Sequence, residues 1–216
     1  MQIHSTDSKL KKQVLLTGAT GFVGRQVLRE LMNHDVRVTV VVRDGKQSMI
    51  ELISNVDTIV STSDLFMEDS NWWCKTCQGV DTVIHVAWYA EPQKYLQSSL
   101  NLDCLSGTLN LAKGAAQAGV RRFVGIGTCF EYELTNDVLS VETPLKPLTP
   151  YAAAKVAAYM MLSQWFSHQY VSFAWCRLFY LYGEGEDKRR LIPYLRTQLA
   201  AGKPAERSWD RIDTGC

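Results

Sequence analysis

The sequence lacks the long apolar segments and the charge excess that mark membrane proteins and nucleic-acid-binding proteins. No apolar run approaches the roughly 18 residues that a transmembrane helix requires. Residues 1–12 also lack the apolar core of a secretory signal peptide. The 23 lysines and arginines are balanced by 22 aspartates and glutamates, which leaves no general field to attract polyanions. We therefore expect a cytoplasmic protein whose partner is neither a nucleic acid nor a membrane.

Cysteine and histidine are too scattered to predict a metal site. Cys74 and Cys77 form a CxxC pair, but no second pair of cysteines or histidines accompanies them, so we expect no metal. Cys104, Cys129 and Cys176 lie among apolar residues and are predicted to be small buried side chains. In a cytoplasmic protein all six cysteines are expected to be reduced.

The sequence does contain a regular alternation of short apolar stretches and longer helical patterns. Six stretches are predicted to be strands buried on both faces: 13–17, 36–42, 56–60, 80–87, 122–128 and 171–179. Helical patterns lie between them at 22–34, 66–78, 96–119 and 151–169. This order predicts an α/β protein with a doubly wound parallel sheet, a Rossmann fold, over residues 13–180.

A glycine-rich turn, TGATGFVG (17–24), joins the first predicted strand to the first predicted helix. Gly18 permits the tight turn, Gly21 lets the backbone approach a pyrophosphate, and Gly24 lets the helix pack on the sheet. The helix N-terminus adds unpaired N–H groups and a partial positive charge. Because the motif stands between a strand and a helix, we predict a dinucleotide site.

The ends of the second and third strands bear on the choice of dinucleotide. Arg43 precedes Asp44 at the end of the second strand, and a guanidinium there suits the 2′-phosphate of NADP. Arg25, in the first turn of the first helix, also favours a nearby anion. We therefore expect NADP rather than NAD, although Asp44 keeps NAD open. At the third strand's end, Asp64 is placed to receive the adenine amino group and Leu65 to pack on the ring, although a simple strand-end turn explains both residues nearly as well.

A second motif, PYAAAK (150–155), predicts acid–base chemistry. Tyr151 and Lys155 stand four residues apart and therefore share one face of a helix. A nearby ammonium lowers the pKa of a phenol from its usual value near 10. Such a tyrosine can exchange a proton with a hydroxyl or carbonyl while hydride moves at the attached carbon.

Together, TGATGFVG, VDTVIHVA (80–87), Asn101, Thr128, YAAAK and RLFYLYGEGE (177–186) resemble the extended short-chain dehydrogenase/reductase family, in its nucleotide-sugar epimerase, dehydratase and 4-reductase branch. The resemblance implies that Tyr151 is the acid–base group and that Lys155 also binds the cofactor. It implies that Thr128, four residues before Tyr132, orients the sugar, with Asn101 in support. It assigns the following further residues to the cofactor: Thr20, Phe22, Val23, Ala87 and Phe179.

Two departures from that family narrow the expected reaction. The family's sugar 4,6-dehydratases carry Asp-Glu directly after the hydroxyl residue, where this sequence has Cys129 and Phe130. Glu131 lies one position too late for a simple replacement, so dehydration is disfavoured. Two reactions remain: reduction of a 4-keto nucleotide sugar by NADPH, or 4-epimerisation with a retained NAD. Arg43 favours the reduction, because a guanidinium at that position suits the 2′-phosphate of NADPH.

The second departure concerns the C-terminal segment, since family members typically continue for up to about another hundred residues. We expect residues 1–12 to be a flexible N-terminus and residues 181–216 to begin a rudimentary substrate lobe. Trp209, Asp210 and Arg211 faintly resemble the family's diphosphate-gripping motif. A non-catalytic, NADP-binding remnant is therefore a further alternative.

The helices predicted near 97–118 and 151–168 carry apolar residues on more than one face. One face is needed to cover the sheet, and the second fits either a helix-pair homodimer or a large buried core. The family resemblance favours the homodimer.

Overall fold

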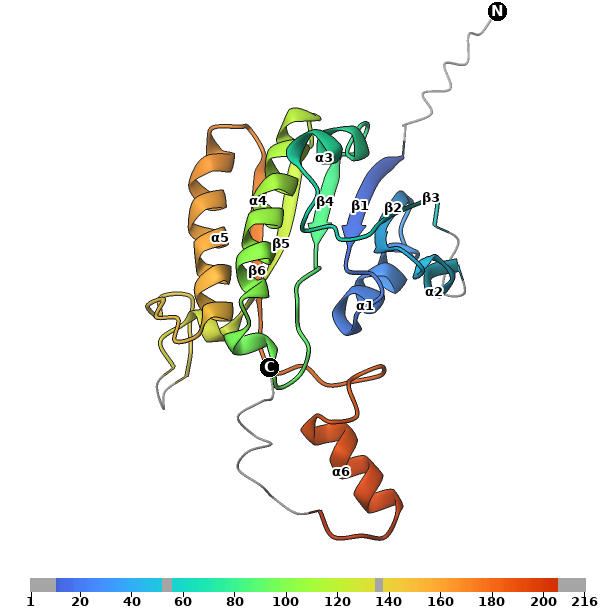
Figure 1. Cartoon of the computed structure of the whole chain (residues 1–216), viewed down its shortest axis with the longest axis vertical. Coiled ribbons are helices and arrows are strands. Elements are labelled where there is room, and N and C mark those ends of the chain that lie inside the picture. Colours follow the sequence, from blue (N-terminus) through green and yellow to red (C-terminus); the bar gives the residue numbers. More distant parts are fainter. Residues whose placement is uncertain (1–10, 52–55, 135–137, 206–216) are drawn as a thin grey trace, which may run out of the picture.

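The computed structural model describes residues 11–51, 56–134 and 138–205, and it confirms the doubly wound parallel sheet. All strand pairs are parallel, in the order β3-β2-β1-β4-β5-β6. The order reverses between β1 and β4, which makes that place the switch point of the fold (Figure 1). The strands are β1 (Lys12–Thr17), β2 (Val36–Arg43), β3 (Thr58–Thr62), β4 (Thr82–His85), β5 (Arg122–Thr128) and β6 (Ser172–Leu178).

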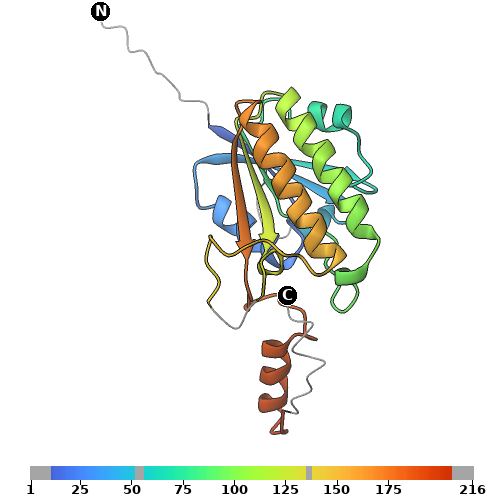
Figure 2. The ribbon, with the colours of Figure 1, turned by 90° about the vertical axis from the view of Figure 1, so that its left-hand side faces the viewer.

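Helices cover both faces of the sheet, and Figure 2 shows the two longest lying side by side on the same face. The helices are α1 (Phe22–Leu31), α2 (Gln47–Glu51), α3 (Ser70–Thr76), α4 (Leu100–Gln117), α5 (Pro150–Ser167) and α6 (Leu191–Ala200). Short 3₁₀ turns, η1 (Tyr95–Gln97) and η2 (Cys129–Glu131), follow β4 and β5. Helix α6 lies apart from the sheet layers in both views, and none of its residues is buried (Figures 1 and 2).

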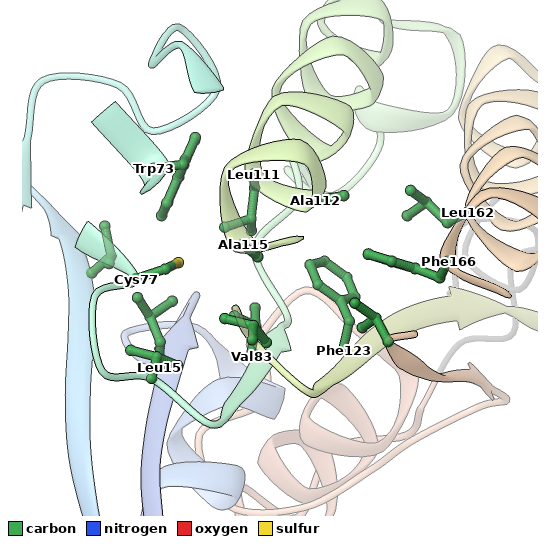
Figure 3. Close-up of a cluster of buried hydrophobic side chains, with 14 residues drawn as sticks. Leu15, Trp73, Cys77, Val83, Leu111, Ala112, Ala115, Phe123, Leu162 and Phe166 are labelled. Carbon is green, nitrogen blue, oxygen red and sulfur yellow. The ribbon is translucent and has the colours of Figure 1, made fainter. Parts of the chain in front are cut away.

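Two apolar cores, one on each face, hold these layers together. On the face of α3, α4 and α5, Phe123 of β5 packs against Phe166 of α5, with ring centres 5.1 Å apart (Figure 3). On the opposite face, Leu28 of α1 and Ile50 of α2 pack against β1 and β2. Neighbouring strand residues such as Leu15 and Leu16 enter opposite cores, which explains the unbroken apolar runs.

Local capping explains where the helices begin. The side chain of Asp69 accepts the N–H of Trp72, so α3 begins at Ser70 rather than at residue 66. Thr149 caps α5, and Pro150 occupies its first turn, where a missing N–H costs nothing. The short helix α2 was not predicted, because five residues are too few to show a period.

Two expectations about burial and strand length were wrong. The strand predicted at 80–87 ends at His85, because its neighbour β1 ends at Thr17: the N–H of Val86 still bonds to the Thr17 carbonyl, but that of Ala87 bonds to the Thr17 hydroxyl. Cys176 is exposed, whereas Cys104 and Cys129 are buried as expected. Cys176 alternates with Trp175 and Arg177, which face α5, and therefore points to the opposite side of the edge strand β6.

Candidate active site

A cleft of about 600 Å³ lies at the carboxyl ends of the strands and gathers nearly all of the predicted site residues. In a doubly wound sheet this edge is where ligands bind. The lining includes these predicted residues: Gly18, Thr20, Gly21, Phe22, Val23, Gly24, Arg43, Asp64, Leu65, Ala87, Thr128, Tyr151, Lys155 and Phe179. Asn101 is the one predicted site residue that does not line it.

The glycine loop has the close backbone contacts that its motif predicts. Gly18 has a φ of +77°, and a Cβ there would lie 2.6 Å from the backbone nitrogen of Ala87. A Cβ at Gly24 would overlap the carbonyl oxygen of Gly18. These positions bring β1, α1 and the end of β4 together without side chains between them.

Helix α1 starts with Gly21 as its N-cap, and no side chain caps it. Phe22 and Val23, in its first turn, line the cleft. Uncapped N–H groups at a helix N-terminus, beside a loop without side chains, suit the oxygens of a pyrophosphate. The chain therefore fits a dinucleotide at this end of the cleft.

Lys155 lies at the base of the cleft and is almost completely buried, with 3% of its surface exposed. Its Nζ atom donates a hydrogen bond to the carbonyl oxygen of Ile126 at 2.6 Å and lies 3.8 Å from the centre of the Trp88 ring. Burial lowers the pKa of Lys155 to about 7, and the negative charge of Glu131 opposes that fall. The side chain is thus poised to change its charge near neutral pH.

Tyr151 occupies the first turn of α5 and faces the cleft one turn before Lys155. Its ring meets that of Tyr95 edge to face at 4.7 Å and that of Trp88 at 6.4 Å. Two perpendicular aromatic contacts restrict the ring's orientation. A phenol held in this way beside a lysine can pass a proton to or from a reacting oxygen.

Thr128 ends β5 and begins the turn η2, with 4% of its surface exposed. Its hydroxyl oxygen accepts the N–H of Phe130 at 3.3 Å, which fixes the side-chain rotamer. A hydroxyl that accepts in this way still has its own proton to donate. Thr128 can therefore offer a hydrogen bond to an oxygen held in the cleft that it lines.

Glu131 is fully buried, and its carboxylate is committed to the protein interior. It accepts hydrogen bonds from the backbone N–H of Thr128 at 2.8 Å and from Arg177 Nε at 2.7 Å. Its oxygens also lie 3.0 and 3.1 Å from the indole nitrogen of Trp175. Glu131 does not line the cleft, so it cannot replace the Asp-Glu pair of a dehydratase.

Asn101 is buried in α4 and organises the segment that follows β4. Its amide nitrogen donates to the carbonyl oxygens of Tyr95 at 2.7 Å and Ser98 at 2.9 Å. Its amide oxygen accepts the indole N–H of Trp88 at 2.9 Å. Asn101 thus positions Trp88, a residue that was not predicted from the sequence and that directly covers Lys155.

At the far end of the cleft, the lining includes Arg43, Lys46 and Asp64. Lys46 was not predicted, because the prediction of the cofactor's 2′-phosphate site used only the residues at the end of the second strand, and Lys46 lies beyond them. Asp64 Oδ1 accepts the N–H of Phe66 at 3.0 Å, which holds the turn after β3. In the described part of the chain, the Nε atom of Arg25 is buried without a hydrogen-bond partner.

The segment after β6 borders the cleft with Phe179, Leu181, Gly185, Asp187 and Arg190. It is tied to α1 by Glu184, whose carboxylate pairs with Arg29 at 3.3 Å and whose carbonyl accepts from Gln26. Helix α1 and this segment therefore lie next to each other at the border of the cleft. None of the described helices is long and apolar enough to cross a membrane. Trp209, Asp210 and Arg211 lie outside the described residues.

Comparisons with known proteins agree with this fold. A sequence model described as the NAD dependent epimerase/dehydratase family matches residues 14–213. The dTDP-6-deoxy-L-talose 4-dehydrogenase (NAD(+)) of Aggregatibacter actinomycetemcomitans is 24% identical over 172 residues, covering 79% of this chain and 62% of that protein. The match therefore spans less than two thirds of that relative's length.

Solved structures of similar fold include two enzymes that act on nucleotide sugars. The UDP-N-acetylglucosamine 4-epimerase of Methanobrevibacter ruminantium M1 matches with a TM-score of 0.76 and 21% identity, over 89% of this chain and 64% of that one. The dTDP-glucose 4,6-dehydratase of Streptomyces venezuelae, solved with NAD, matches with a TM-score of 0.71 and 24% identity, over 88% and 62%.

Proposed function

Because the chain belongs to the NAD-dependent epimerase/dehydratase family, we propose that it binds a nicotinamide dinucleotide and carries out keto–hydroxyl redox chemistry on a nucleotide-diphosphate sugar. The observation that carries this proposal is the meeting of Thr128, Tyr151 and Lys155 with the glycine loop in one cleft. The bound dinucleotide supplies or takes the hydride. Side chains of the protein are responsible for binding the substrate, orienting it and transferring the proton.

In this proposal the glycine loop and the N-terminus of α1 hold the pyrophosphate. Thr128 donates a hydrogen bond to the sugar oxygen, and Tyr151 gives it or takes from it a proton. Lys155 stabilises the tyrosinate with its positive charge and binds the ribose of the dinucleotide. Asn101 supports them by holding Trp88 against Lys155.

Reduction of a 4-keto sugar is the reaction that we favour. Cys129 and Phe130 follow Thr128 and offer no acid–base pair for water loss, and Glu131 is bound to Arg177. The similarity to a 4-dehydrogenase supports simple redox chemistry at this carbon. The similarity to a 4-epimerase keeps epimerisation as the alternative, in which hydride leaves and returns to the same sugar.

For the dinucleotide we favour NADP, because Arg43 and Lys46 line the cleft and offer two positive charges to a 2′-phosphate. The name of the 4-dehydrogenase relative specifies NAD, and the dehydratase was solved with NAD. NAD is therefore the alternative cofactor.

We also propose a homodimer through α4 and α5, which pack against each other. These helices leave large apolar side chains exposed on their outer surface: Leu102 at 68%, Met160 at 59% and Met161 at 55%. A M160E/M161E variant should sediment as a monomer if this surface forms the interface. A monomeric wild-type chain would contradict the dimer.

The deciding experiment first measures the binding of NADPH and NADH by fluorescence titration and then adds 4-keto nucleotide sugars as substrates. We expect cofactor oxidation by the wild-type chain and its loss in Tyr151→Phe, with cofactor binding retained. Interconversion of 4-epimers without added cofactor would favour the epimerase. Cofactor binding without turnover, unchanged in Tyr151→Phe, would show a cofactor-binding protein without catalytic activity.

A further inference from the structure

Glu131 belongs to a buried ion pair directly behind the cleft. Its Oε2 atom lies 2.7 Å from Arg177 Nε, and Glu131 is 0% exposed. The Arg177 guanidinium carbon lies 5.0 Å from the centre of the Tyr132 ring and 4.4 Å from that of Tyr159. Removing one partner of such a pair would leave the other charge buried and uncompensated, which is strongly destabilising. Each side chain is therefore held in place by its need for the other.

The backbone of β5 is shaped to admit this carboxylate. A Cβ at Gly127 would overlap both Glu131 Oε1 and the indole nitrogen of Trp175. Only a glycine lets the carboxylate lie against the strand and receive the indole N–H. Three elements, β5, η2 and β6, therefore converge on one side chain.

On one side, the carboxylate holds the residue that carries the hydroxyl of the site. Glu131 Oε1 accepts the backbone N–H of Thr128, and Thr128 in turn caps the turn that contains Glu131. This reciprocal arrangement fixes the backbone from which the Thr128 hydroxyl enters the cleft.

On the other side, the carboxylate acts on Lys155. The acidic groups whose charge affects Lys155 are Glu131 and the Cys104 thiol. Burial raises the pKa of Cys104 to about 11, so that thiol is neutral at pH 7. His85 lies on β4 near Lys155, and burial lowers its pKa to about 3, so it too is neutral. Arg177 is already paired with Glu131, and Tyr151 lies one turn earlier on the same helix as Lys155.

We propose that Glu131 is a positioning residue of the site, which fixes Thr128 through its N–H and places a negative charge behind the Lys155 ammonium. It never touches the substrate. The catalytic meaning of this role depends on the function proposed above for Thr128 and Lys155, but the physical role does not.

The test uses Glu131→Gln, which keeps the shape and one carbonyl oxygen but removes the charge. Glu133→Gln is the matched control, because Glu133 makes the same kind of pair with Lys146 on the surface. NMR of ¹³C-labelled lysine, assigned with Lys155→Met, follows the titration of Lys155 in the cofactor-free protein. We expect a downward shift of about one pH unit in Glu131→Gln and none in Glu133→Gln.

The Thr128 amide proton gives a second readout. Hydrogen-bonded to a carboxylate, it should resonate downfield in the wild type and move upfield in Glu131→Gln. If Glu131→Gln does not fold, the E131Q/R177M variant removes both charges and the same two signals are measured. An unchanged Lys155 titration together with an unchanged Thr128 amide would overturn the proposal.

These measurements need neither substrate nor cofactor. Failure of the wild-type chain to turn over nucleotide sugars would therefore count against the proposed function alone. A shifted Lys155 titration would still support the positioning role of Glu131.

Discussion

The Nδ1 atom of His85 lies 2.8 Å from the hydroxyl oxygen of Thr17, which joins the ends of β4 and β1 beneath the glycine loop. On its other side, His85 Nε2 lies 2.9 Å from the hydroxyl of Thr108. Thr108 donates its own proton to the carbonyl of Cys104 at 2.7 Å, so it must accept from Nε2–H. His85 is therefore neutral, with its proton on Nε2, and Thr17 donates to Nδ1.

This buried neutral histidine should make the protein sensitive to acid. Burial, and then the charge of Lys155, lowers the pKa of His85 to about 3 from an ordinary value of 6.5. Between these values the unfolded chain binds a proton that the folded chain does not, so stability falls as the pH falls. The steepest slope is about 1.4 kcal/mol for each pH unit. Urea unfolding of His85→Asn between about pH 4 and pH 6, both inside that window, should show a flatter profile than the wild type. Exposed His168→Asn should keep the wild-type slope.

Lys155 produces a similar dependence on the alkaline side. Its pKa is lowered from 10.5 to about 7, so between those values the unfolded chain holds a proton that the folded chain has lost. Wild-type stability should therefore rise with pH across this window. Lys155→Met should remove that rise in stability. Its gain in stability over the wild type should be largest at the lower end of this pH window. Lys113→Met, an exposed position on α4, is the control. Parallel curves for Lys155→Met and wild type would contradict the buried charge.

Gly24→Ala should disrupt the glycine loop, because its Cβ would overlap backbone atoms of Gly18 that cannot rotate away. We expect a loss of roughly 3 kcal/mol or more in the free energy of unfolding, together with weaker dinucleotide binding. Gly45→Ala meets no atom within 4 Å and should cost only about 1 kcal/mol for its φ of +77°. Thermal unfolding compares the stability of the two variants, and fluorescence titration compares their affinity for the dinucleotide. Equal losses would mean that close packing at Gly24 is unimportant.

Arg43→Ala should weaken NADPH binding by about 10-fold to 100-fold, the usual worth of a charged hydrogen bond to phosphate. NADH, which lacks the 2′-phosphate, should bind almost as before. Arg37→Ala, an exposed position on the same strand, should leave both affinities unchanged. An NADH affinity that equals or exceeds that of NADPH, and that is insensitive to Arg43→Ala, would establish NAD as the cofactor.

Asn101→Ala leaves two backbone carbonyls and the indole N–H of Trp88 without their partner. We expect a loss of about 2–4 kcal/mol in stability and a lower kcat, because Trp88 is no longer held over Lys155. Asn110→Ala, on the same helix, removes a single bond of 3.3 Å to the carbonyl of Glu68 and should cost less than half as much. A kcat unchanged in Asn101→Ala would limit Asn101 to a structural role.

The sheet and most of the cleft could be predicted from sequence because their signals are local. An apolar run such as residues 122–128 predicts a buried strand without reference to the rest of the chain. The glycine spacing and PYAAAK are also local, since each falls within eight consecutive residues or fewer. The topology of the fold then brings these local motifs to one edge of the sheet.

The contacts missed from sequence join residues that are far apart along the chain. Glu131 was considered as a substitute catalytic carboxylate, and its partner Arg177 lies 46 positions away. Trp88 gave no signal, since its position over Lys155 depends on Asn101 in another helix. Asn101 was assigned to the site by resemblance, and no spacing rule indicates that its amide turns away from the cleft.

Gly127 carries a consequence for how this sequence can diverge. The missing side chain leaves room for both the Glu131 carboxylate and the Trp175 indole, so the three positions are not independent. A larger residue at 127 becomes acceptable only after 131 and 175 have both become smaller or apolar. We expect homologues to vary at these three positions as a set, and substitutions that are tolerated in one lineage to be harmful in another.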